Sequence, residues 1–185
     1  MRLKGFNYSH DAYYFVTLCT EDKVNYFGEI VYEEMVLNNC GKIASEYWKQ
    51  IEEHFKNIIL DEFVVMPNHL HGIIAIITDL KRQDTDFVGD AYMRPLMKNT
   101  GKTKMLLCKV IQQYKSSVTR KINNLHNVGF GWQRSFYDRI IRTNREFYNV
   151  QSYIHDNPLR WALDIENTDC FLHSAKDYYN KIFQK

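Results

Sequence analysis

Apolar residues recur along the chain with two different periods, and the changes of period divide it into strands and helices. Short runs rich in β-branched and aromatic residues, or almost wholly apolar, predict strands at 12–20, 58–66 and 70–78, a hairpin at 26–37 and a further strand within 132–142. Apolar spacings of three and four predict helices at 38–56, 102–125 and 144–157. This order of elements predicts an α+β domain in which helices cover an antiparallel sheet.

The organisation of the chain predicts one domain over residues 1–185, because no linker divides it and its length allows a full hydrophobic core. Residues 79–101 are polar with little periodicity, which favours a flexible loop, and residues 165–185 form a C-terminal extension. No apolar run reaches the roughly 20 residues that cross a bilayer, and the cysteines are scattered singly. We therefore expect a cytoplasmic protein with no membrane association.

The formal net charge is only +2, but the charges are unevenly placed. Residues 91–137 contain no Asp or Glu and carry many Lys and Arg side chains. An uninterrupted positive segment is typical of a surface that binds a polyphosphate backbone. A solvated face balanced by acidic residues elsewhere explains the same pattern, so charge alone does not decide between the two.

Two histidines separated by one residue lie in a predicted strand. Side chains alternate along a strand, so His69 and His71 point to one face about 6.6 Å apart, while Leu70 points to the other. Two neutral imidazoles at this spacing can hold one divalent ion. An incidental pair is the alternative, and two ligands bind weakly, so a metal site needs a further donor.

A tyrosine and an asparagine lie one turn apart near the end of the last predicted helix. Tyr153 borders the apolar stripe of that helix, and Asn157 follows it by four residues. Pro158 disfavours helical geometry at Asn157, which leaves the amide free to turn inward. The phenol is then a candidate nucleophile and the amide oxygen a candidate third ligand, although a buried aromatic and a helix cap are the alternative. With a pKa of about 10, the phenol needs a base or a cation nearby.

Three ordered motifs resemble those of one known family. Residues 65–72 (VMPNHLHG) resemble the His-hydrophobic-His motif of the HUH single-tyrosine transposases, which include insertion-sequence enzymes and REP-associated tyrosine transposases. Residues 132–141 (WQRSFYDRII) and 153–160 (YIHDNPLR) resemble the later signatures of that family, in the same order. The resemblance covers roughly residues 3–162 and implies a ferredoxin-like antiparallel sheet, with the histidines on a central strand and the tyrosine on a helix lying across it.

The resemblance also implies roles for particular residues. His69 and His71 match the metal ligands of the family, Tyr153 matches its nucleophile, and Asn157 stands where some members have a Gln ligand. The implied reaction cuts one DNA strand at a subterminal hairpin, which leaves a 5′-phosphotyrosine and a free 3′-hydroxyl, and a 3′-hydroxyl from another end later reseals the strand. The family uses Mg²⁺ or Mn²⁺, and two imidazoles suit Mn²⁺ better.

The implied partner is single-stranded DNA. Six basic residues of the acid-free segment, residues 91–137, are the expected phosphate contacts: Lys102, Lys104, Lys109, Lys115, Arg120 and Lys121. Insertion-sequence members exchange tyrosine helices within a dimer, whereas REP-associated members can act as monomers. The many apolar side chains of a small sheet favour a homodimer here. Two alternatives stay open, namely a non-catalytic or domesticated single-stranded nucleic-acid-binding protein on the same sheet and a metal-dependent hydrolase that activates water at the histidines.

Overall fold

The computed structural model describes residues 12–77, 106–126, 128–168, 180 and 182. The loop predicted at 79–101, the basic residues Lys102 and Lys104, and most of the extension predicted at 165–185 lie outside the described residues. Within the described part, no helix has both the length and the apolar character needed to cross a membrane.

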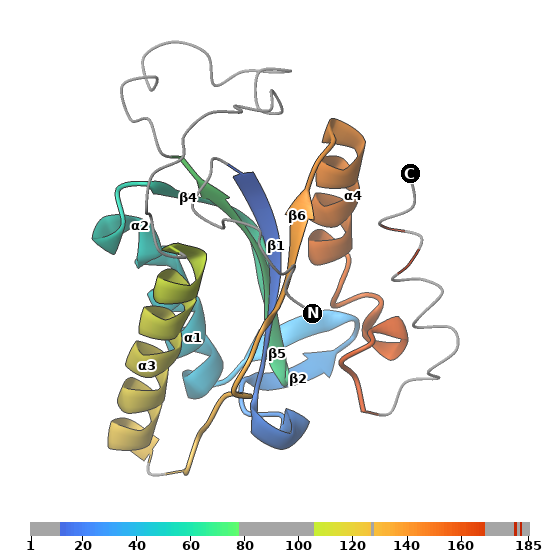
Figure 1. Ribbon diagram of the computed structural model, residues 1–185. Coiled ribbons are helices and arrows are strands. Elements are labelled where there is room, and N and C mark those ends of the chain that lie inside the picture. The colour runs from blue at the N-terminus through green and yellow to red at the C-terminus, as the bar shows by residue number, and fades with distance from the viewer. Residues whose placement is uncertain (1–11, 78–105, 127, 169–179, 181, 183–185) are drawn as a thin grey trace.

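A four-stranded antiparallel sheet forms the centre of the fold (Figure 1). Its strands, in spatial order, are β4 (Ile58–Met66), β5 (His69–Ile76), β1 (Ala12–Cys19) and β6 (Tyr137–Ile141). Helices lie between β1 and β4 and between β5 and β6 in the chain, and they are α1 (Asn39–Lys49), α2 (Ile51–His54) and α3 (Leu106–His126). This βαββαβ order with β1 and β5 in the middle is the ferredoxin-like arrangement, so the predicted fold class is confirmed.

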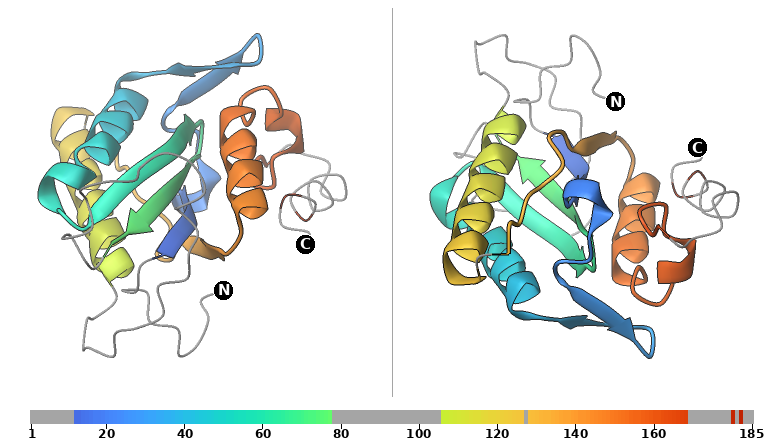
Figure 2. Two further views of the ribbon diagram at one scale, coloured as in Figure 1. Left: turned by 90° about the horizontal axis from the view of Figure 1, so that it is seen from above. Right: turned by 90° about the horizontal axis from the view of Figure 1, so that it is seen from below.

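Helices cover both faces of the sheet. Helices α1 and α3 lie on one face, and α4 (Asn144–His155) lies on the other (Figures 1 and 2). Alternation along β1 sends Tyr14, Val16 and Leu18 into the larger core under α1 and α3. Phe15 points the opposite way, into a smaller cluster with Val150 of α4. Any group on the α4 face is therefore separated from α3 by the full thickness of the sheet.

The predicted hairpin at 26–37 is present as β2 (Gly28–Val31) and β3 (Glu34–Leu37). Its two turn residues, Tyr32 and Glu33, have φ values of 49° and 65°, as a type I′ turn requires. The helix predicted over 38–56 begins as expected, with the Asn38 side chain accepting a hydrogen bond from the Gly41 amide at 3.0 Å. It is divided at Gln50, whose φ and ψ of −76° and −6° stay near helical values. The chain therefore passes from α1 into α2 through a residue of near-helical geometry, with no proline at the break.

We expect Gly72→Ala to lower the free energy of unfolding by about 1–3 kcal/mol, because an added Cβ at this position of β5 would collide with the Trp48 indole of α1. Urea unfolding measures the change. Gly131→Ala is the matched control, since its Cβ would meet only the carboxylate end of the flexible Glu21 side chain. Equal unfolding midpoints for the two variants would contradict this packing.

Candidate metal and nucleophile site

The β4–β5 hairpin places the two histidines. Met66 pairs with His69, so residues 67 and 68 alone form the turn, and β5 begins at the first histidine. His69 and His71 both point to the α4 face, are fully buried, and have ring centroids 4.3 Å apart. The prediction that alternation places both imidazoles on one face is confirmed, because Leu70 between them belongs to the core on the opposite face.

Helix α4 places the predicted nucleophile beside the histidines. The helix begins after Thr143, whose hydroxyl accepts a hydrogen bond from the Glu146 amide at 3.1 Å. The Tyr153 ring meets the edge of Phe15 on β1, with centroids 5.9 Å apart and an angle of 82°. Its hydroxyl lies 3.2 Å from His71 Nε2. The phenol and the imidazole pair, far apart in the sequence, therefore meet within one chain.

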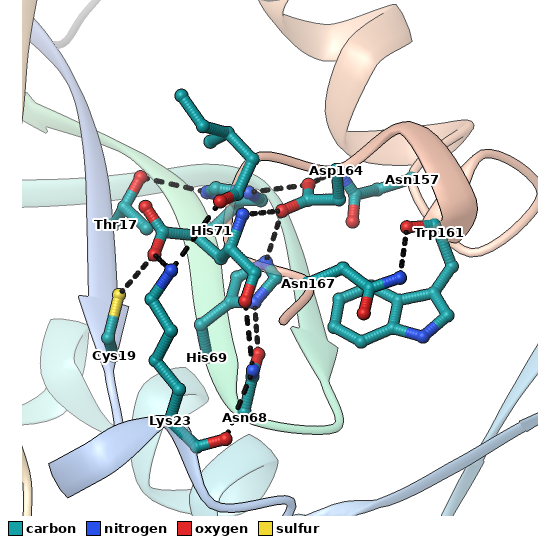
Figure 3. Close-up of polar contacts among 12 residues, drawn as sticks. Thr17, Cys19, Lys23, Asn68, His69, His71, Asn157, Trp161, Asp164 and Asn167 are labelled. Carbon is teal, nitrogen blue, oxygen red and sulfur yellow. Dashed lines mark hydrogen bonds and ion pairs between the residues drawn. The ribbon is translucent and has the colours of Figure 1, made fainter. Parts of the chain in front are cut away.

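A carboxylate that the sequence analysis missed lies at the centre of this group (Figure 3). Asp164 is 2% exposed and follows the short 3₁₀ helix η4 (Trp161–Leu163). Its Oδ2 accepts hydrogen bonds from the Tyr153 hydroxyl and from Asn157 Nδ2, both at 2.8 Å. The same oxygen lies 3.5 Å from His71 Nε2, and Oδ1 lies 4.0 Å from His69 Nε2. Because Asp164 lies beyond Pro158, no helical period relates it to Tyr153, and the sequence carried no signal for it.

The donor set fits a divalent cation. One ligand atom each of His69, His71 and Asp164 lie within 4.8 Å of one another. Both Nδ1 atoms are engaged elsewhere, by Asn68 Oδ1 at 2.8 Å and by Thr17 Oγ1 at 2.9 Å. The buried Nε2 of His69 has no hydrogen-bond partner among the described residues. In a metal-bound histidine, one ring nitrogen binds the ion and a hydrogen bond usually holds the other, which is the role that the Nδ1 contacts would have here.

Asn157 also lies in this group, although its geometry leaves its predicted ligand role open. Its Nδ2 donates to Asp164, and its buried Oδ1 has no hydrogen-bond partner within the described part of the chain. The amide therefore holds the carboxylate in place and presents an unsatisfied oxygen. Its role as a ligand stays a prediction.

The protonation states also suit a metal site. Burial, reinforced by the neighbouring His71, lowers the pKa of His69 to about 3, so this imidazole is neutral at pH 7. Burial acts to raise the pKa of Asp164, but its contacts with His69, His71 and Asn157 hold it below its ordinary value. Neutral imidazole and ionised carboxylate are the forms that bind cations.

The basic residues predicted to contact DNA lie on the other side of the sheet. Lys109, Arg120 and Lys121 are exposed on α3, which covers the face opposite α4. The Lys115 ammonium donates to the backbone oxygens of Gln133 and Ser135, both at 2.8 Å. These side chains therefore do not converge on the histidines, and a DNA contact through α3 would be a separate surface. Their role in DNA binding stays a prediction.

Comparison with known proteins gives both a relative and a structural neighbour. No protein-family model matches the chain. A protein of Haemophilus influenzae (strain Rd), described only as an uncharacterized protein, is 35% identical over 167 residues, which is 89% of either chain. A solved structure of a REP-associated tyrosine transposase bound to a REP hairpin superposes with a TM-score of 0.54 and 17% identity, over 87% of this chain and 74% of that one.

The chain shares its fold with this REP-associated tyrosine transposase, as expected from the resemblance of the motifs. The chain belongs to the same family as the Haemophilus influenzae protein.

Proposed function

We propose that this chain is a metal-dependent single-stranded DNA endonuclease and strand transferase, a transposase that forms a 5′-phosphotyrosine at Tyr153 and then rejoins DNA ends. One observation supports this function above all others. The Tyr153 hydroxyl lies 2.8 Å from the Asp164 carboxylate and 3.2 Å from the His71 imidazole. A tyrosine that only filled the core would not require a neighbouring group of metal-ligand type.

Cleavage begins with attack of the Tyr153 oxygen on the phosphorus of a DNA phosphodiester. The phenol proton passes to Asp164 Oδ2, which already accepts a hydrogen bond from it. The bond from phosphorus to the 3′ oxygen breaks, and this oxygen leaves as a 3′-hydroxyl after taking a proton. Attack by a 3′-hydroxyl from another end reverses the step and releases Tyr153, so the phosphodiester is conserved and no nucleotide cofactor is consumed.

The ion, Mg²⁺ or Mn²⁺, would be held by His69, His71 and Asp164, with the Asn157 amide oxygen as a further donor. When bound, it supplies positive charge that polarises the phosphate and offsets charge in the transition state. Two imidazoles favour Mn²⁺, because Mg²⁺ prefers an all-oxygen shell.

Access to the site requires movement of the chain. His69, His71 and Asp164 are at most 2% exposed, and Tyr153 is 3% exposed. A phosphodiester can therefore reach the phenol only after groups that cover the site move aside.

DNA hairpins are the proposed substrate class. The REP-associated tyrosine transposase of the same fold was solved bound to a REP hairpin. Since the chain here shares only the fold with that protein, the hairpin substrate is part of the proposal. Tiled single-stranded oligonucleotides covering the DNA on either side of the gene, incubated with Mn²⁺ and separated on a denaturing gel, test it. The expected product is a labelled band that migrates with the protein, whereas a nick without such a band would indicate water as the nucleophile.

Neutralising three exposed basic residues of α3 should weaken DNA binding without changing the metal site. For the triple variant Lys109→Gln, Arg120→Gln and Lys121→Gln, we expect the slope of log affinity against log salt to fall by about 2, since each lost phosphate contact removes about 0.7 for single strands. Fluorescence anisotropy over a salt series measures the slope. The control removes three exposed positive charges outside the acid-free segment, at Lys42, Lys56 and Arg145. If the slope of log affinity against log salt fell equally in both triple variants, α3 would be rejected as the DNA-binding surface.

A further inference from the structure

The second residue of the β4–β5 turn contacts both halves of the proposed metal site. Asn68 is fully buried, and its Oδ1 lies 2.8 Å from His69 Nδ1. Its Nδ2 donates to the backbone oxygen of Glu166 at 3.0 Å and to that of Lys23 at 3.3 Å. The side chain therefore links the first histidine to the segment that carries the carboxylate (Figure 3).

The orientation of the Asn68 amide follows from its partners. Backbone oxygens only accept hydrogen bonds, so the side of the amide that faces Glu166 and Lys23 must be the nitrogen. The amide oxygen then faces the imidazole. The backbone of Asn68 is fixed as well, because its carbonyl accepts from both the amide and the hydroxyl of Thr20 at 2.9 Å.

This orientation determines which nitrogen of His69 carries the proton. An amide oxygen cannot donate, so a hydrogen bond between it and Nδ1 requires a proton on Nδ1. In the neutral ring, Nε2 then has a free lone pair, and this buried atom faces Asp164 Oδ1 at 4.0 Å. His71 is not constrained in the same way, because its Nδ1 meets the Thr17 hydroxyl, which can either donate or accept.

We infer that Asn68 is a positioning residue that sets the tautomer of His69 and so prepares Nε2 as the ligand atom, an inference that rests on the proposed function for its metal. The same amide holds the Glu166 backbone, whose N–H in turn donates to Asp164 Oδ1 at 2.7 Å. One side chain thus orients two members of the candidate ligand set, one through its oxygen and one through its nitrogen.

Two substitutions separate these two contacts. Asn68→Asp retains an oxygen that accepts from His69 but loses the donor to Glu166 and Lys23. Asn68→Leu loses both. The matched control is Asn123→Leu. The Asn123 amide also makes two hydrogen bonds to the backbone, since its nitrogen donates to the Phe130 carbonyl and its oxygen accepts from the Phe130 N–H, but Asn123 lies on α3. The control measures the general cost of removing an amide that links two backbone groups, here a part-buried one.

The tautomer can be read directly in the metal-free protein. Long-range ¹H–¹⁵N spectra distinguish a protonated ring nitrogen from an unprotonated one, and the loss of signals in His69→Gln assigns the ring. We expect Nδ1–H in the wild type and in Asn68→Asp, and a mixture or Nε2–H in Asn68→Leu. A wild-type His69 protonated on Nε2 overturns the inference, even if neither variant can be prepared.

Metal affinity gives the second measurement. Calorimetry with Mn²⁺ alone should show binding weakened about 10–100-fold in Asn68→Leu, the usual cost of losing a group behind a ligand, but near wild-type binding in Asn123→Leu. Asn68→Asp should bind Mn²⁺ more tightly than Asn68→Leu but more weakly than the wild type, because it keeps the contact with His69 and loses the one with Glu166. Wild-type affinity in Asn68→Leu overturns the inference. Normal tautomers and normal Mn²⁺ binding without any DNA cleavage would instead count against the proposed transposase function.

Discussion

Tyr153→Phe should abolish the covalent protein–DNA product, reducing its rate of formation by at least about a thousandfold. The substitution removes only the oxygen that attacks phosphorus. The Phe ring retains the edge contact with Phe15, and the lost hydrogen bond to the ionised Asp164 costs about 1.5–3 kcal/mol, which leaves the rest of the core packing in place. Labelled oligonucleotides and Mn²⁺ on a denaturing gel measure the product.

A second tyrosine of α4 gives the control for this variant. Tyr148 is 61% exposed and lies on the same helix, so Tyr148→Phe should form the covalent product at the wild-type rate. Unchanged Mn²⁺ binding in Tyr153→Phe would show that only the nucleophile had been removed. A covalent product formed normally by Tyr153→Phe would reject this tyrosine as the nucleophile.

His69→Ala and His71→Ala should each weaken Mn²⁺ binding by more than about a hundredfold and eliminate cleavage. Either substitution removes one of three candidate ligands whose atoms lie within 4.8 Å of one another. Calorimetry measures the affinity. Thermal unfolding supplies an independent measurement, since Mn²⁺ should raise the melting temperature of the wild type but not of the variants.

The control for the histidine variants is His155→Ala, because His155 is exposed at the end of α4. This variant should bind Mn²⁺ and cleave DNA as the wild type does. Removal of metal with EDTA should stop cleavage in the wild type, and added Mn²⁺ should restore it. Cleavage that persists in EDTA, or full Mn²⁺ affinity in both His69→Ala and His71→Ala, would contradict a metal site at these residues.

The periodic parts of the fold were predictable from the sequence. Continuous apolar character identified β5 as a central strand, and alternation placed His69 and His71 on one face with Leu70 on the other. Spacings of three and four identified α4 and the position of Tyr153 beside its buried stripe. These predictions succeeded because each depends on local geometry. Within one strand or helix, the spacing of residues in the sequence determines the face to which their side chains point.

The contacts between elements were not predictable in the same way. Asp164 reaches the site from an irregular segment, and Asn68 acts through a turn, so neither belongs to a periodic pattern. The basic residues of α3 illustrate a related difficulty, since a run of positive charge does not say which face of the sheet its helix covers. Only the packing of the elements determines such positions.

For Asn157, the residue type alone did not determine what the side chain does in the site. Its spacing from Tyr153 correctly placed the amide near the histidines, but an amide has both a donor and an acceptor end. Here the donor end holds Asp164, and the oxygen is buried without a hydrogen-bond partner in the described part of the chain. A carboxylate nearby therefore changes the expected ligand set from two imidazoles and an amide to one that includes Asp164.

Mass spectrometry of the trypsin-digested protein–DNA product tests the proposed chemistry most directly. The peptide spanning residues 146–160 contains both Tyr148 and Tyr153, and fragmentation tells which of them carries the mass of a nucleotide phosphate. We predict that the phosphate is attached to Tyr153 alone, by a bond to the 5′ end of the cut strand. Attachment to any other residue, or cut ends that carry a free 5′ phosphate with no peptide attached, would contradict the account.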